Sequence, residues 1–124
     1  MLTTPQYFST AAEDEYFFVE GCHILEYLND PADSECSIAR ARVEPGVQTR
    51  LHSLIDTTER YLIQSGSGIA TIAGETKRLA AGDVVVIPAD CPQQIRNDGE
   101  DDLVFLAICT PRFVPECYRD LEDS

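Results

Sequence analysis

Two residues with the chemistry for metal binding or proton transfer, His52 and Glu59, stand seven positions apart in this chain. An imidazole and a carboxylate that face one pocket can hold a divalent metal, or can carry protons to and from a bound molecule. Both residues lie in short apolar runs typical of strands, in which residues i and i+2 point to the same face. Glu59 should therefore share its face with Tyr61, and His52 should share its face with Arg50.

Short apolar runs separated by turn signals must position these groups. The segments between the runs are rich in Gly, Pro, Asn and Asp, which break helices and form turns. Many short strands at near-regular spacing predict an all-β sandwich or barrel. The expected strands are YFFV (16–19), CHILEYL (22–28), SIARARV (37–43), VQTRLHSL (47–54), ERYLIQ (59–64), GIATIA (68–73), DVVVIP (83–88), PQQIRN (92–97) and LVFLAIC (103–109). The segment FVPECYRDLE (113–122) is expected to form a short helix or an irregular tail.

The charge balance narrows the class of partner. Nine Lys and Arg stand against 22 Asp and Glu, and the formal net charge is −13. A surface this acidic repels phosphate backbones and anionic membranes, so neither nucleic acid nor a membrane is an expected partner. The longest apolar run, 103–109, is far too short to span a bilayer.

Cysteine usage indicates the compartment. Five cysteines, an odd number without a CxxC spacing, argue against a disulfide framework and against a thiolate zinc site. The first residues show no basic stretch followed by an apolar one, so a secretory signal is not expected. Reduced thiols are the rule in the cytosol, and the expected localisation is therefore cytoplasmic.

Two gapped motifs around the candidate residues resemble the signatures of the cupin superfamily, G-x5-H-x-H-x3/4-E-x6-G and G-x5-P-x-G-x2-H-x3-N. The matching positions are Gly46, His52, Leu54, Glu59 and Gly66 in the first motif, and Gly82, Pro88, Asp90, Gln93 and Asn97 in the second. The resemblance implies an all-β jelly-roll barrel, the double-stranded β-helix. It also implies one domain over residues 1–124, with the barrel at about 16–110 and a C-terminal tail at 111–124. A homodimer is implied too, with residues 16–28 contributing to it.

The ligand set that the resemblance implies is depleted here. Cupins with a metal usually hold it with three histidines and a glutamate, but Leu54 stands at the second histidine position and Gln93 at the third. His52, Glu59 and Gln93, completed by water, form a reduced set for Zn, Mn, Fe or Ni. Without a metal, the same three residues would form a polar cluster that binds a small molecule, with His52 or Glu59 as proton carrier. As a third interpretation, His52 and Glu59 are satisfied core residues.

Other residues could join the site. Arg40 and Arg42 alternate on one expected strand, and with Arg50 they would suit a carboxylate or phosphate if they pointed inward. Otherwise they pair with the abundant acids at the surface. His23 is a candidate replacement ligand, with packing at a strand edge as the alternative. Cys109 lines the pocket floor or fills apolar space.

Tyr61 has two interpretations as well. Its hydroxyl could donate a proton to a ligand, or its ring could form an aromatic wall of the core.

Two classes of function follow from the resemblance. The first is a metal-assisted enzyme of the isomerase or lyase type on a small polar or anionic substrate, similar to the sugar-isomerase group, with Glu59, His52 and Tyr61 as catalytic residues. Dioxygenase chemistry is less favoured, because Gln93 and Leu54 make a poor iron site. The second is a metal-free ligand-binding module or sensor without catalysis. We expect the enzyme.

Overall fold

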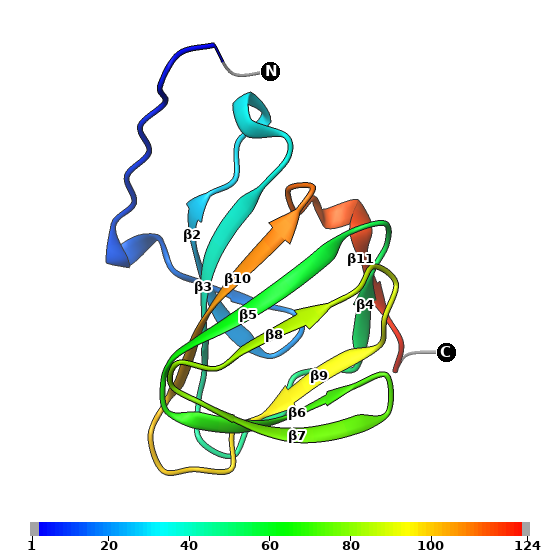
Figure 1. Cartoon of the computed structure of the whole chain (residues 1–124). Coiled ribbons are helices and arrows are strands. Elements are labelled where there is room, and N and C mark those ends of the chain that lie inside the picture. Colours follow the sequence, from blue (N-terminus) through cyan, green and yellow to red (C-terminus); the bar gives the residue numbers. More distant parts are fainter. Residues whose placement is uncertain (1–2, 123–124) are drawn as a thin grey trace.

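The strands form two antiparallel sheets (Figure 1) in the computed structural model, which describes residues 3–122. The first sheet contains, in spatial order, β1 (Tyr16–Phe18), β2 (Cys22–Leu28), β3 (Ser37–Val43), β10 (Leu103–Thr110), β5 (Thr58–Ser65) and β8 (Val84–Ile87). The second contains β11 (Tyr118–Asp120), β4 (His52–Leu54), β9 (Gln93–Arg96), β6 (Ser67–Ile72) and β7 (Glu75–Ala80). Single 3-10 turns lie at Ala12–Asp14 (η1), Pro31–Asp33 (η2) and Pro115–Cys117 (η3).

The chain passes repeatedly from one sheet to the other, as a jelly roll requires. From β3 it crosses to β4, returns to β5, crosses again to β6 and β7, and then visits β8, β9 and β10 in alternate sheets. The predicted all-β jelly-roll fold is confirmed. No helix among residues 3–122 is long and apolar enough to cross a membrane.

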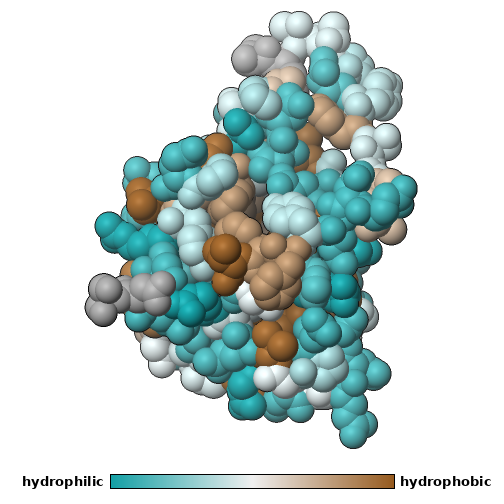
Figure 2. All heavy atoms as spheres, turned by 180° about the vertical axis from the view of Figure 1, so that it is seen from behind, coloured by the Kyte–Doolittle hydropathy of each residue, from teal (hydrophilic) through white to brown (hydrophobic). Residues whose placement is uncertain are grey.

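Alternating side chains build the core between the sheets. On β5 the residues Glu59, Tyr61 and Ile63 are buried and their neighbours are not, as the i, i+2 rule predicts. Ile63 packs in one apolar cluster with residues of both sheets, among them Leu103 and Ile95. Seen from behind, most of the surface is hydrophilic, and apolar side chains gather near the centre of that face (Figure 2).

Gly66 makes the corner that sends the chain from β5 to the second sheet. Its φ is +77°, and a Cβ at this position would lie 2.5 Å from the carbonyl oxygen of Asp102. A side chain here would therefore be strained by the backbone conformation and would collide with neighbouring backbone. This corner explains why glycine is needed at the end of the first motif.

Beyond small differences in strand bounds, the observed strands differ from the expected ones at β7 and in the segment 47–54. The segments CHILEYL and SIARARV have the predicted bounds. Strand β7 was not predicted, because five of its six residues are exposed and it lacks an apolar alternation. Of the segment 47–54, only His52–Leu54 forms a strand, since Thr49 N donates to Ile95 O and Arg50 N to Glu20 O instead.

The tail forms more structure than expected. A 3-10 turn is followed by β11, which pairs with β4. Residues 123 and 124, the last of the predicted tail at 111–124, lie outside the described residues. The pairing of β11 with β4 brings the tail against the strand that carries His52.

Candidate functional site

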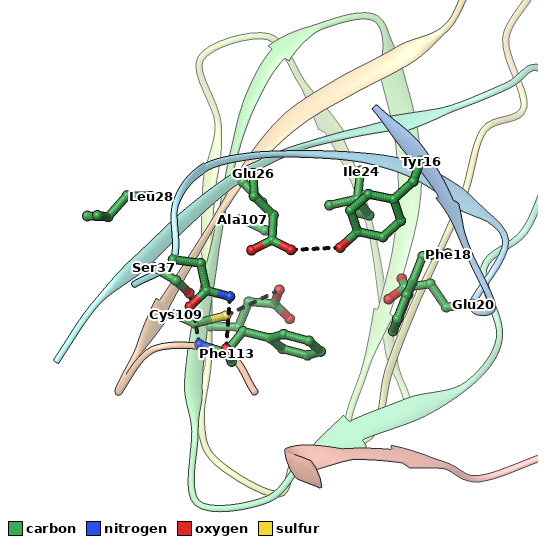
Figure 3. A pocket seen from close by; sticks show the side chains of 13 residues that line it. Tyr16, Phe18, Glu20, Ile24, Glu26, Leu28, Ser37, Ala107, Cys109 and Phe113 are labelled. Carbon is green, nitrogen blue, oxygen red and sulfur yellow. Dashed lines mark hydrogen bonds between the residues drawn. The ribbon is translucent and has the colours of Figure 1, made fainter. Parts of the chain in front are cut away.

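A cavity of about 60 Å³ lies where β1, β2, β3, β5 and β10 come together (Figure 3). A cavity of this size has room for a few water molecules or a small chemical group. Its wall consists of alternate residues of these strands, the turn after β1 and one side chain beyond β10. They are Tyr16, Phe18, Glu20, Ile24, Glu26, Leu28, Asn29, Ser37, Ala39, Glu59, Ala107, Cys109 and Phe113.

Glu59 is the predicted site residue that lines this cavity. It is 8% exposed, and its Oε2 accepts a weak hydrogen bond from the Cys109 thiol at 3.7 Å. Its Oε1 is buried and has no hydrogen-bond partner among the described residues. Burial raises the pKa of Glu59 to about 7 and the charge of Glu20 adds to this, while the nearby His52 ring and Gln93 amide act in the opposite direction. A buried carboxylate oxygen without a hydrogen-bond partner is costly, so Oε1 is a candidate contact for a ligand.

Glu20 is a second carboxylate in the same wall, and the sequence analysis missed it. It lies in the turn between β1 and β2, and its side chain is only 14% exposed. Burial raises its pKa to about 7 as well, against a smaller lowering by the Cys22 thiol. A glutamate in a hairpin turn is normally solvated, so no local signal distinguished it from the other acids near the N-terminus.

His52 is held rigidly beside these carboxylates. It is 1% exposed, and its Nδ1 donates to the carbonyl oxygen of Arg50 at 2.7 Å. Its ring stacks on Tyr118 of β11, with centroids 5.1 Å apart. Burial lowers the pKa of His52, so the neutral ring presents an unprotonated Nε2, which lies 3.8 Å from Glu20 Oε1.

Gln93 and Tyr61 form a buried pair next to His52. Gln93 is directly opposite His52 in the pairing of β4 with β9. Its Oε1 accepts a hydrogen bond from the Tyr61 hydroxyl at 2.5 Å, and the Tyr61 ring packs on Phe105 at 4.3 Å between centroids. Burial raises the pKa of Tyr61 well above its ordinary value, so the hydroxyl stays protonated. Neither residue is part of the cavity wall.

The family model of the cupin domain, Cupin_2, matches residues 39–109, which is more than half of the chain. The chain belongs to the cupin family. It is also 34% identical over 86 residues to a protein of Methanocaldococcus jannaschii named "Uncharacterized protein MJ1618", and the match covers 69% of each chain.

Solved structures agree with this cupin fold. KdgF from Halomonas sp. superposes with a TM-score of 0.76 at 18% identity, covering 89% of this chain and 96% of that one. Pac13 of Streptomyces, described as a nucleoside dehydratase, superposes with a TM-score of 0.76 at 17% identity, covering 94% and 92%. At these identities the similarity establishes the fold alone.

The three arginines considered for an anionic ligand form ion pairs with carboxylates of the protein itself. Arg42 Nη2 lies 2.7 Å from Glu15 Oε1, and Arg40 Nη2 lies 3.2 Å from Glu15 Oε2. Arg50 Nε lies 2.9 Å from Asp120 Oδ2. None of the three lines the cavity, so the structure does not bring them to the same place as Glu59.

Of the two remaining candidates, His23 and Cys109, Cys109 lines the cavity and His23 does not. His23 Nε2 lies 2.8 Å from Glu44 Oε2 and is not in the cavity wall. Cys109 does line the cavity, and burial raises the pKa of its thiol, so it is an apolar, protonated part of the wall.

The donor set of this cupin does not fit a four-ligand metal centre. Leu54 packs in an apolar cluster with Cys109 and Cys117. The amide oxygen of Gln93 is occupied by the Tyr61 hydroxyl. Within residues 3–122, no group of three or more His, Cys, Asp or Glu side chains could hold a metal ion. His52 and Glu59 alone would hold a divalent ion weakly, since tight sites use more protein ligands.

Proposed function

We propose that this cupin binds a small polar molecule at the cavity and catalyses proton transfer on it, as an acid–base enzyme of the lyase or isomerase type. The observation that carries the proposal is Glu59 Oε1, a buried acceptor without a partner among the described residues, in a wall that also contains Glu20. A fully solvated carboxylate would be a weak base, whereas burial without a counter-ion strengthens it as a base near neutral pH.

The two carboxyl groups can take complementary roles. Because burial raises the pKa of each to about 7, and the charge of Glu20 raises that of Glu59 further, the pair would hold about one proton near neutral pH. The ionised group, Glu59, would take a proton from a substrate carbon next to a carbonyl. The protonated group, Glu20, would give its proton to the leaving hydroxyl, which departs as water, or to the carbonyl oxygen in an isomerisation.

His52 would act as a positioning residue in this scheme. Its Nδ1–H is fixed by the carbonyl of Arg50 and its ring by Tyr118, so its Nε2 is available only as an acceptor toward Glu20. At 3.8 Å the Nε2 does not hydrogen-bond Glu20 Oε1 directly, so a bound molecule or water would connect the two. The similarity to Pac13, described as a nucleoside dehydratase, supports lyase chemistry by analogy of fold.

A metal-assisted version of the same reaction is the second candidate, and the orientation of His52 favours it. A metal-bound histidine usually donates its other N–H to a carbonyl or carboxylate, as His52 Nδ1 does to Arg50. Zn, Mn, Fe or Ni held by His52, Glu59 and Gln93 would supply a Lewis acid for a substrate oxygen. This version requires Gln93 to release Tyr61.

The test is exchange of substrate protons with solvent. A panel of small hydroxy- and keto-compounds is incubated with the protein in deuterated water, and loss of carbon-bound proton signals is followed by NMR. The variant Glu59→Gln keeps the shape of the side chain and removes the base, so exchange should fall at least ~100-fold. The matched control is Glu75→Gln on β7, an exposed residue outside the cavity. Equal exchange by Glu59→Gln and wild type would reject the proposal.

A further inference from the structure

We propose that the cavity selects a ligand that carries a primary ammonium group, and that it discriminates against carboxylates and phosphates. This inference rests on the proposed function and deepens it, since it names the charge class of the substrate. It departs from the anionic substrate that Arg40, Arg42 and Arg50 led us to consider.

The charged residues of the cavity wall all have the same sign. Glu20, Glu26 and Glu59 line the wall, and no Lys, Arg or His does. Figure 3 shows Glu26 beside Tyr16, and Glu20 beside Phe18 at another part of the wall. An anion placed here would be repelled by whichever of these carboxyl groups are ionised, whereas a cation would be attracted by them.

The protein does not neutralise these carboxylates itself. Among the described residues, Glu26 accepts a neutral hydrogen bond from the Tyr16 hydroxyl at 2.8 Å, and Glu59 accepts one from the Cys109 thiol. The His52 ring, whose Nε2 lies 3.8 Å from Glu20 Oε1, would balance the charge of Glu20 only if it were protonated, and burial lowers the pKa of His52. Among the described residues, Arg40, Arg42 and Arg50 form ion pairs with Glu15, Asp102, Asp120 and Glu122 instead.

Basic side chains of β3 and of the segment after β10 contact other groups, although the buried Nε of Arg40 has no partner among residues 3–122. Arg40 and Arg42 contact Glu15, whose two oxygens they share. Arg112 donates to Asn29 Oδ1 at 2.9 Å, and Asn29 in turn donates to the carbonyl of Phe113. Asn29 thus uses its amide oxygen and one of its two N–H donors within the protein, and it carries no charge that would balance an anion.

The buried oxygen of Glu59 is the second, independent indication of a ligand. Its Oε1 is an acceptor without a donor among residues 3–122, in a residue that is 8% exposed. An ammonium supplies three N–H donors and a positive charge, so it meets both the missing hydrogen bond and the missing counter-ion. A hydroxyl group meets only the first requirement, and a carboxylate meets neither.

The rest of the wall suits a short aliphatic amine. Tyr16, Phe18 and Phe113 are aromatic, and the Phe18 and Phe113 rings meet edge to face with centroids 6.1 Å apart. Aromatic faces attract cations, and the apolar Ile24 and Leu28 provide contacts for methylene groups. The volume of about 60 Å³ admits an ammonium head with a few carbons, so a larger substrate would place only this part inside.

The experiment compares three probes of one shape that differ in charge: n-butylamine, n-butanol and butyrate. Each is titrated into the full-length protein near neutral pH at fixed ionic strength, and backbone amide shifts are followed by NMR. We expect the amine to shift residues of β1, β2 and β10 and to bind at least about tenfold more tightly than butanol. Butyrate should produce no shifts at the cavity. Butanol or butyrate binding as tightly as the amine, or amine shifts confined to other surfaces, would overturn the inference.

Glu26→Gln keeps the test separate from folding and from the proposed chemistry. Glu26 is only partly buried and has no role in the proton transfer proposed above. The variant should reduce the preference for amine over butanol about threefold or more, while Glu75→Gln should leave it unchanged. An unchanged preference in Glu26→Gln, with the fold intact by NMR, counts against the inference.

The two proposals can fail separately. Amine selectivity without proton exchange on any compound of the panel, extended to amino-substituted hydroxy- and keto-compounds, would support the cationic ligand and reject the acid–base enzyme. Proton exchange on neutral or anionic substrates that depends on Glu59, without amine selectivity, would support the enzyme and reject the cationic ligand.

Discussion

Glu15 and Glu20 are separated by four residues in the sequence, yet they lie in opposite electrostatic environments. Glu15 receives hydrogen bonds from Arg42 and Arg40, and the Arg42 contact contributes most to lowering its pKa to about 2. Glu20 is turned into the cavity without a cationic partner, and burial raises its pKa to about 7. The charge of a carboxylate in this protein is therefore decided by which segment of chain lies opposite it.

The same difference bears on where a ligand would bind. Arg40 and Arg42 of β3 form ion pairs with Glu15 and do not line the cavity. The charged residues of the cavity wall are all glutamates. Ion pairs such as the one at Glu15 contribute to the fold, whereas unpaired buried acids cost stability and persist where a site needs them. The predictions below either sharpen or remove this contrast.

The largest effect is expected on the rate of proton exchange when Glu59 is replaced. Glu59→Gln should lower the rate of proton exchange at least ~100-fold, because the amide cannot accept the substrate proton. Glu15→Gln should leave the rate within about threefold of wild type, since Glu15 does not line the cavity. Rates are measured by NMR at saturating substrate. A comparable loss in both variants would remove the contrast between the two carboxylates.

The stability of the wild type should depend on pH through Glu59. Its carboxyl keeps its proton to about pH 7 when folded but loses it above about pH 4.5 when unfolded. The unfolded state therefore binds fewer protons between these values, and stability falls as pH rises. Glu59→Gln lacks this loss, so its free energy of unfolding should gain up to about 3 kcal/mol on wild type across the window. Urea unfolding at several pH values measures it.

The comparison between variant and wild type matters here because other buried groups titrate in the same range. Glu20 acts in the same direction as Glu59. His52 acts in the opposite direction, because its lowered pKa costs stability as pH falls below about 6.5. A constant difference between Glu59→Gln and wild type over the window would show that Glu59 is ionised throughout.

Glu15 should show the opposite dependence on pH, with a smaller effect. Its pKa falls to about 2 on folding, so its stabilising contribution is complete above about pH 4.5 and is lost as pH falls toward 2. Near neutral pH, Glu15→Gln should cost about 1 kcal/mol, since the pair is partly solvated and two arginines lose their partner. Urea unfolding checks the value. An equal cost at pH 7 and at pH 2 would mean that the ion pair contributes nothing.

The smallest effect is expected for metals. A bound ion would supply to Glu59 the positive charge that Arg42 supplies to Glu15, and the contrast between them would disappear. Because the donor set is incomplete, we expect no stoichiometric metal by elemental analysis of protein purified without a histidine tag. Incubation with Zn, Mn, Fe and Ni should leave the melting temperature unchanged. Near-stoichiometric metal that is lost in His52→Ala and in Gln93→Ala would restore the metal-assisted enzyme.

Local sequence patterns were sufficient to predict most strands and the residues that lie around His52 and Glu59. The alternation around Glu59 and Tyr61 and the glycine at 66 follow from backbone geometry that neighbouring residues determine. The two gapped motifs likewise brought His52 and Gln93 to adjacent strands, where they pair directly. Strand β7 was not predicted, because five of its six residues are exposed and no burial pattern distinguished it from a turn.

The all-β fold and the placement of His52 opposite Gln93 could be predicted from the sequence, since strand periodicity and motif spacing are local properties. The charge around these residues could not, because it depends on the tertiary structure. Whether Arg42 meets Glu15 or the cavity, and whether Glu20 points to solvent or toward His52, depends on which distant segments pack together. Coulomb energies depend on distance in space and on burial, and neither can be obtained from spacing along the chain.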